Sequence, residues 1–160
     1  MKILVTFYSK TGNTRRAANE IAKYINADID EIIDLESRKG IIGWFKSGRD
    51  EVKGYKTEIK TNRNPGDYDL VIIGTPVWAW ASTPAVRTYA EKFKDKLNKV
   101  AVFSTSGDTV PEKPKLILEK ILGKEISTCT GWTSEEIKNK KIYQEKMENF
   151  IEALKKNFDL

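Results

Sequence analysis

The fold class follows from one segment near the start of the chain, Ile3-Leu4-Val5-Thr6-Phe7-Tyr8, and from the segment after it, Ser9-Lys10-Thr11-Gly12-Asn13-Thr14. The first segment is largely apolar and shows no clean alternation. Such a run is typical of a strand that is covered on both faces of a parallel sheet. The second segment is polar and leads directly into a helical pattern, in which Ala18, Ile21, Ala22 and Ile25 share one face. A buried strand, a polar loop and a helix indicate an α/β protein.

Four further strands are predicted along the chain. Leu70 to Gly74 and Val100 to Phe103 resemble the first strand, whereas Ile29 to Leu35 and Glu125 to Trp132 carry interleaved polar residues and are expected at the sheet edges. With the second and fifth strands at the edges, the strand order is 2-1-3-4-5. The prediction is a three-layer open sandwich with a five-stranded parallel sheet and right-handed crossovers, forming one domain over residues 1–160.

Helical patterns lie between and after these strands. One begins at Pro84 and runs to Leu97, and a shorter one follows Pro114 and stops at Gly123. A further helix is predicted over Ile41 to Tyr55, although three glycines weaken the pattern. The last helix begins after Thr133 and places one apolar stripe toward the sheet, formed by Met147, Phe150, Ile151, Leu154 and Phe158.

Composition restricts the chemistry that this chain can perform with its own side chains. The 160 residues include no histidine and one cysteine, Cys129. Catalysis by imidazole and histidine-ligated metal sites are therefore excluded, and this chain alone forms no internal disulfide, cysteine zinc site or cysteine-held iron–sulfur cluster. Cys129 is expected to be buried in the fifth strand without a redox role, and a reducing, cytoplasmic setting is expected.

The loop after the first strand has the chemistry of a phosphate site. It combines three hydroxyls, a glycine that lets backbone approach closely, and the start of a helix, which presents N–H donors to an anion. The spacing is neither that of a Walker loop nor that of a dinucleotide fold. The alternative is a hydroxyl-rich turn that only caps the helix. The candidate residues are Ser9, Lys10, Thr11, Gly12, Asn13 and Thr14.

Two more loops are expected at the same edge, because ligands of such sheets bind beyond the carboxyl ends of the strands. The loop after the third strand carries two tryptophans that a flat aromatic ligand would cover, and the loop after the fourth is small and polar. In the alternative interpretation, the tryptophans only cover the end of the sheet, and the polar loop is a simple turn. The candidate residues are Thr75, Pro76, Val77, Trp78, Ala79, Trp80, Ser104, Thr105, Ser106, Gly107 and Asp108. One loop suits a phosphate, one a flat ring and one the polar edge of a ring. Together the three loops favour FMN as the cofactor.

The chain resembles the flavodoxin family. The family's (Thr/Ser)-x-Thr-Gly-x-Thr phosphate signature is matched at Ser9, Thr11, Gly12 and Thr14, and the element order is followed from Lys2 to Leu160. The resemblance implies that Thr75 to Trp80 flank the isoalloxazine ring of FMN and that Ser104 to Thr109 contact its pyrimidine edge. It also implies a carrier that shuttles electrons between redox partners.

Two other functions are compatible with the sequence. One is an FMN-dependent oxidoreductase of the NAD(P)H:quinone type, since the loop after the fourth strand offers no second aromatic to cover the flavin. The other is an interaction module that no longer binds FMN, against which the intact phosphate signature argues.

The net charge of +5 is confined to one stretch of the chain. Arg38 to Arg63 holds 8 basic and 3 acidic residues, and the rest of the chain is balanced. This stretch is either a solvated lysine-rich face or the surface that docks a redox protein, such as a reductase or an iron–sulfur protein. No nucleic-acid motif, no apolar run long enough to span a membrane and no secretory leader are found, so neither a nucleic-acid nor a membrane partner is expected.

Overall fold

A central parallel sheet organises the chain, of which the computed structural model describes residues 1–36, 57–78, 81–107 and 112–160. The strand order is β2-β1-β5-β7-β8, and each neighbouring pair is parallel. These strands are the second, first, third, fourth and fifth predicted ones, so the predicted order 2-1-3-4-5 is confirmed. The strands of the sheet are β1 (Ile3–Phe7), β2 (Asp28–Glu31), β5 (Leu70–Trp78), β7 (Lys99–Ser106) and β8 (Cys129–Thr133).

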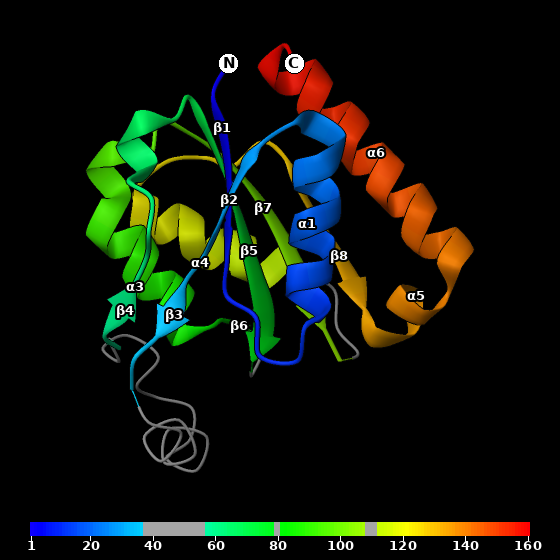
Figure 1. Ribbon diagram of the computed structural model, residues 1–160, viewed down its shortest axis with the longest axis horizontal. Coiled ribbons are helices and arrows are strands. Elements are labelled where there is room, and N and C mark those ends of the chain that lie inside the picture. The colour runs from blue at the N-terminus through cyan, green and yellow to red at the C-terminus, as the bar shows by residue number, and fades with distance from the viewer. Residues whose placement is uncertain (37–56, 79–80, 108–111) are drawn as a thin grey trace.

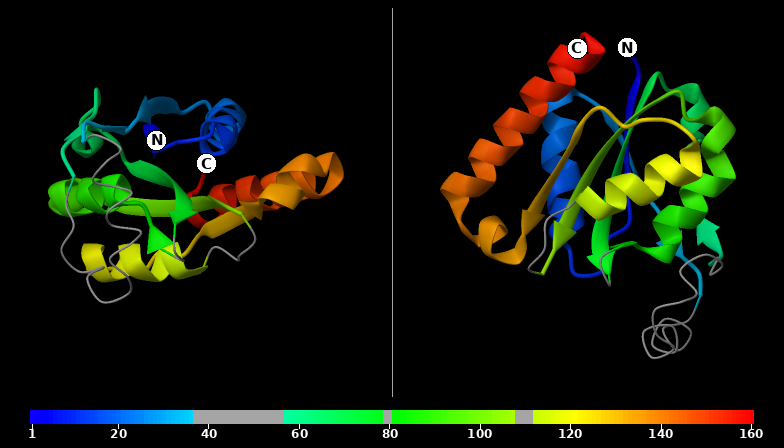
Figure 2. Two further views of the ribbon diagram at one scale, coloured as in Figure 1. Left: turned by 90° about the horizontal axis from the view of Figure 1, so that it is seen from below. Right: turned by 180° about the vertical axis from the view of Figure 1, so that it is seen from behind.

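Helices cover both faces of this sheet. Figure 1 shows α1 in front of the strands, and the rear view in Figure 2 brings α4 to the front, so the sheet lies between two helical layers. The helices are α1 (Asn13–Ile25), α3 (Pro84–Phe93), α4 (Glu112–Leu122), α5 (Ser134–Lys138) and α6 (Lys140–Phe158). The short elements are β3 (Ile33–Asp34), β4 (Ile59–Lys60), β6 (Ala81–Ser82) and the 3-10 turns η1 (Pro65–Asp67) and η2 (Lys94–Lys96).

The core has two halves, one on each face of the sheet. On one face, Ile3 and Val5 of β1 pack with the buried sides of α1 and α6, including the predicted apolar stripe of α6. On the other face, Leu4 of β1 packs with α3 and α4. Every residue of β1 is buried. Burial on both sides explains why this strand shows no alternation of apolar and polar residues.

The second predicted strand, Ile29 to Leu35, is divided. β2 ends at Glu31, and β3 leaves the main sheet to pair antiparallel with β4. A buried carboxylate accounts for this change, because Asp30 accepts N–H bonds from Asn62 at 3.0 Å and from Arg63 at 3.0 Å. Asp30 thereby fixes the returning segment beside β2.

The fifth predicted strand is shorter than expected, and Cys129 is exposed rather than buried. Trp132 points into the core shared with α1 and α6, so a side chain three residues earlier points to the opposite face of β8. The helices that pack on β8 are α5 and α6. The predicted helix at Ile41 to Tyr55 lies outside the described residues, as does the basic stretch up to residue 56.

Candidate functional site

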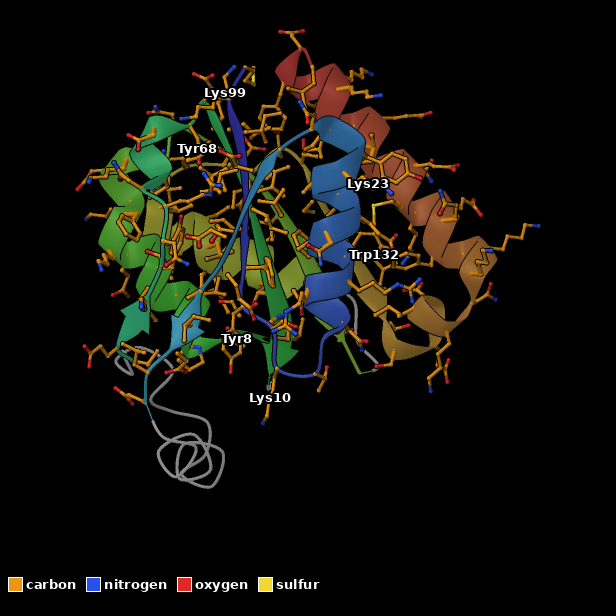
Figure 3. The ribbon with its side chains drawn as sticks, in the orientation of Figure 1. Tyr8, Lys10, Lys23, Tyr68, Lys99 and Trp132 are labelled. Carbon is orange, nitrogen blue, oxygen red and sulfur yellow. The ribbon has the colours of Figure 1, made fainter. Side chains whose placement is uncertain are left out.

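The candidate site lies at the carboxyl edge of the sheet, where the segments after β1, β5 and β7 meet. Figure 3 labels Tyr8 and Lys10 at this edge and Tyr68 and Lys99 at the opposite one. Tyr8 comes directly after β1, is half-buried, and donates its backbone N–H to the Gly74 carbonyl at 3.1 Å. Tyr8 is not among the site residues predicted from the sequence, although an aromatic side chain directly after a buried strand is a usable signal.

Hydrogen bonds to the hydroxyl of Ser9 organise the first loop. Ser9 Oγ accepts the backbone N–H of Gly12 and that of Arg15, each at 3.2 Å. Arg16 N–H donates to the Gly12 carbonyl at 2.9 Å, which begins the ladder of α1. Among the described residues, the N–H groups of Asn13 and Thr14 donate to no protein atom. They are the unpaired donors of a helix N-terminus and are available to an anion.

Gly12 gives this loop its shape. Its φ is +98°, a left-handed conformation that side chains other than glycine rarely adopt. Apart from its two chain neighbours, no described residue has an atom within 4 Å of where a Cβ would stand, so conformation rather than crowding requires glycine here. The open space above Gly12 and the unpaired N–H donors beside it form a cradle that fits a phosphate group.

A hydroxyl pair joins the first segment to the third. Thr14 Oγ1 and Thr105 Oγ1 lie 2.8 Å apart, and the two residues are 2% and 5% exposed. Thr105 is on β7, so this contact ties the start of α1 to the neighbouring part of the sheet. Lys10 and Thr11 are exposed at the loop, and Asn13 is half-buried.

The second candidate segment is strand rather than loop for most of its length. β5 continues through Trp78. Thr75 and Pro76 pair with β7, and Val77 and Trp78 pair antiparallel with the residues of β6. Thr75 is buried, accepts the Thr83 N–H at 3.2 Å and donates to the Pro76 carbonyl at 2.9 Å. Pro76 and Val77 are half-buried. The Trp78 side chain, Ala79 and Trp80 lie outside the described residues.

The third candidate segment likewise begins as strand. Ser104, Thr105 and Ser106 are the last residues of β7, and all three are buried. The Ser106 carbonyl accepts the Ser134 hydroxyl at 3.1 Å, a contact that sequence reasoning missed because 28 residues separate the two. Gly107 is exposed, and Asp108 lies outside the described residues.

Three buried hydroxyls at this edge have no hydrogen-bond partner within the described part of the protein. They belong to Ser82, Thr83 and Ser104. Buried polar groups without a partner are costly, which makes such groups candidates for contacts to a ligand or to ordered water. Ser104 Oγ belongs to the residues expected beside the polar edge of a flavin ring, so the donors here fit that ligand.

The turn that carries Ser134 is held by a charged cluster. Thr133 caps α5 in a capping box with Glu136, and Glu136 accepts a bond from Lys146 Nζ at 2.7 Å. Partial burial alone would raise the pKa of Glu136, but the bonds from Lys146 and from the Thr133 N–H outweigh burial and hold the pKa below its usual range. Ser134, and with it the Ser106 carbonyl, depends on this cap.

Replacing Glu136 with glutamine is expected to lower the free energy of unfolding by about 1 kcal/mol at pH 7. Because the folded-state pKa of Glu136 is depressed, its contribution is complete above the unfolded pKa of about 4.3 and is lost as the pH falls through the folded pKa. Urea unfolding at pH 7 and at pH 3 measures the difference. A deficit of equal size at both pH values would show that the charge of Glu136 is not responsible.

An alternating α/β sandwich with an anion cradle after its first strand defines a mononucleotide-binding class of protein. Within that class, the profile of a family described as flavodoxin matches residues 2–154. The chain therefore belongs to the flavodoxin family. A search of curated proteins finds no match.

Solved structures share this fold. A flavoprotein from Lactobacillus acidophilus in complex with FMN is 22% identical, with a TM-score of 0.64 and coverage of 86% of this chain and 97% of that one. A protein from Bacteroides eggerthii is 25% identical, with a TM-score of 0.69 and coverage of 93% and 97%. The Streptococcus pneumonia TIGR4 flavodoxin is 16% identical, with a TM-score of 0.58 and coverage of 98% and 99%.

No helix in the described ranges is both long enough and apolar enough to cross a membrane.

Proposed function

We propose that this protein binds FMN at the carboxyl edge of its sheet and transfers electrons between redox partners. The observation that carries the proposal is the loop from Ser9 to Thr14, where the left-handed Gly12 and the unpaired N–H groups of α1 form a phosphate cradle. Membership of the flavodoxin family and the FMN complex of the Lactobacillus acidophilus flavoprotein support this assignment.

The chain's own residues hold and orient the cofactor in this proposal. Thr11 and Thr14 donate hydroxyl hydrogen bonds to the phosphate beside the N–H groups of Asn13 and Thr14. Ser9 shapes the loop by accepting two backbone N–H bonds, and its O–H proton remains free to be donated to the phosphate. The N-terminal end of the helix dipole favours the negative charge of the phosphate.

The ring of FMN is proposed to lie over the ends of β5 and β7. There the unpartnered hydroxyl of Ser104 offers a hydrogen bond to the polar ring edge, and the segment from Thr75 to Trp80 flanks the ring. When bound, the flavin would supply the one- and two-electron redox chemistry.

We propose that the protein works in the cytoplasm. Its redox partner, a reductase or an iron–sulfur protein, would dock on the basic stretch from residue 38 to residue 63. Opposite charges on a partner would steer the encounter. Within the described end of this stretch, Lys60 is exposed, whereas Arg63 is held by Asp28 at 3.0 Å. Glutamate replacements at Lys46, Arg49 and Lys53 test the docking surface through the salt dependence of electron-transfer rates.

The visible spectrum during stepwise reduction with dithionite tests the proposed function. An electron carrier takes up added FMN, accepts electrons in two separated one-electron steps, and oxidises NAD(P)H negligibly by itself. Steady oxidation of NAD(P)H in the presence of a quinone would instead identify an oxidoreductase. A protein that takes up no FMN would contradict both functions.

Exchange of Thr11 for valine is expected to weaken FMN binding roughly 10- to 100-fold, because a hydrogen bond to a charged group contributes about 1.5 to 3 kcal/mol. The Kd follows from quenching of flavin fluorescence by the apoprotein. Thr130, a half-buried residue of β8 outside the site, provides the matched Thr130→Val control. Equal affinity of the two variants would remove Thr11 from the phosphate site.

A further inference from the structure

We infer that Thr105 is a positioning residue, which acts on the phosphate of the cofactor through Thr14 rather than through the flavin ring. The inference rests on the proposed function, namely FMN binding at the loop from Ser9 to Thr14. It assigns to Thr105 a role different from the pyrimidine contact that the resemblance to the flavodoxin family implies.

Thr14 Oγ1 and Thr105 Oγ1 are 2.8 Å apart, and both residues are buried. No other hydrogen bond of either side chain occurs among the described residues. Two hydroxyls in contact share one hydrogen bond, so one oxygen donates and the other accepts.

The direction of that bond is set by what Thr14 must do. Thr14 lies in the first turn of α1, directly after Gly12 and Asn13, where the unpaired N–H groups are available to an anion. A phosphate dianion has only acceptors. If Thr14 donates its proton to the phosphate, its oxygen can take part in the pair only as the acceptor, and Thr105 has to be the donor.

Thr105 therefore orders the proton of Thr14. With Thr105 donating, the hydroxyl of Thr14 is free to point its proton at the phosphate, and the two bonds in series polarise and strengthen each other. Without Thr105, the Thr14 hydroxyl loses a donor in a buried place and its rotation is no longer restrained.

The strand that carries Thr105 explains how this residue is held in place. Thr105 pairs with Pro76 of β5 on one side and with Trp132 of β8 on the other. Trp132 is itself 1% exposed and donates its ring N–H to the Tyr143 carbonyl at 3.3 Å. The donor to Thr14 is thus held in the sheet, whereas Thr14 lies in the first turn of α1, directly after the loop.

Binding of FMN and of riboflavin to the apoprotein tests the inference, because riboflavin has the same ring and lacks the phosphate. Thr105→Val is expected to weaken FMN binding about five- to tenfold and to leave riboflavin binding within about twofold. Thr105→Ser, which keeps the hydroxyl, is expected to restore FMN affinity to within about twofold of the wild type.

A double-mutant cycle with Thr14→Val separates the two routes by which Thr105 can act. If Thr105 acts through Thr14, the double variant binds FMN as weakly as Thr14→Val alone. Additive losses, or equal losses for FMN and riboflavin, would overturn the inference in favour of a direct ring contact. Unchanged FMN affinity of Thr105→Val would overturn it as well.

Thr128→Val is the matched control. Thr128 is another buried threonine, and it lies outside the site. Its hydroxyl accepts a hydrogen bond from Asn157 at 2.8 Å. It is expected to lose stability without loss of FMN affinity. Should Thr105→Val fail to fold, Thr105→Ala supplies the same comparison because it only removes atoms. Wild-type protein that binds no FMN would contradict the proposed function itself, whereas FMN binding that is indifferent to Thr105 contradicts only this inference.

Discussion

Gly12→Val is expected to weaken FMN binding by about 100-fold or more. A β-branched residue at a left-handed position costs about 1 to 3 kcal/mol, and a tenfold change in affinity corresponds to about 1.4 kcal/mol. Gly12 has φ +98°, and beyond its chain neighbours the described part of the protein has no atom within 4 Å of where a Cβ would stand. The valine side chain would both strain the loop and project into the space assigned to the phosphate, so we expect the two effects to act together.

Gly123 provides a matched control for this experiment. It also has a left-handed backbone, with φ +66°, and apart from its chain neighbours a Cβ there would meet no atom of residues 1–36, 57–78, 81–107 or 112–160 within 4 Å. Gly123 ends α4 and is remote from the loop after β1. Gly123→Val should therefore lose stability but keep its FMN affinity. Equal loss of affinity in both variants would mean that the effect of Gly12→Val is a general loss of folding rather than damage to the phosphate cradle.

Gly74→Ala is expected to have the largest effect on stability, lowering the free energy of unfolding by about 3 kcal/mol. A Cβ at this position would stand 2.2 Å from Phe103 Cζ and 2.6 Å from Phe103 Cε1. Phe103 is fully buried and packs edge-on against Trp132, with ring centroids 6.4 Å apart, so its ring has little room to move. Urea denaturation measures the loss.

A second substitution distinguishes this clash from other causes. Phe103→Leu removes the atoms that the new methyl group would meet, so the double variant should regain part of the stability lost in Gly74→Ala. At Gly66, the nearest atom to an added Cβ is 3.4 Å away, and Gly66→Ala is expected to change stability by less than about 0.5 kcal/mol. A double variant that is no more stable than Gly74→Ala would contradict the packing explanation.

Much of the fold could be predicted from the sequence because burial leaves a clear pattern. β1, the main part of β5 and β7 are apolar on both faces, and this property alone places them inside the sheet between the two edge strands. The shape of the first loop could be predicted as well, since Ser9 and Gly12 are close together in the chain and each has a local role. The glycine supplies the left-handed turn, and the serine accepts the N–H groups around it.

The remaining features depend on contacts between distant residues. Asp30 divides the second predicted strand through bonds to Asn62 and Arg63, more than 30 positions away. Thr14 and Thr105 are 91 positions apart. From the sequence, each is therefore predicted to contact the cofactor separately, and the hydrogen bond between them could not be predicted. Cys129 appeared apolar enough to be buried, but its exposure depends on which face of an edge strand the helices cover.

Titration of the apoprotein with FMN and with riboflavin measures the central claim most directly, namely that the loop from Ser9 to Thr14 holds the phosphate of a flavin mononucleotide. We predict one FMN per chain, an affinity for FMN at least about tenfold above that for riboflavin, and loss of this preference in Gly12→Val. Equal binding of the two flavins by the wild-type protein, or no binding of FMN, would contradict the account.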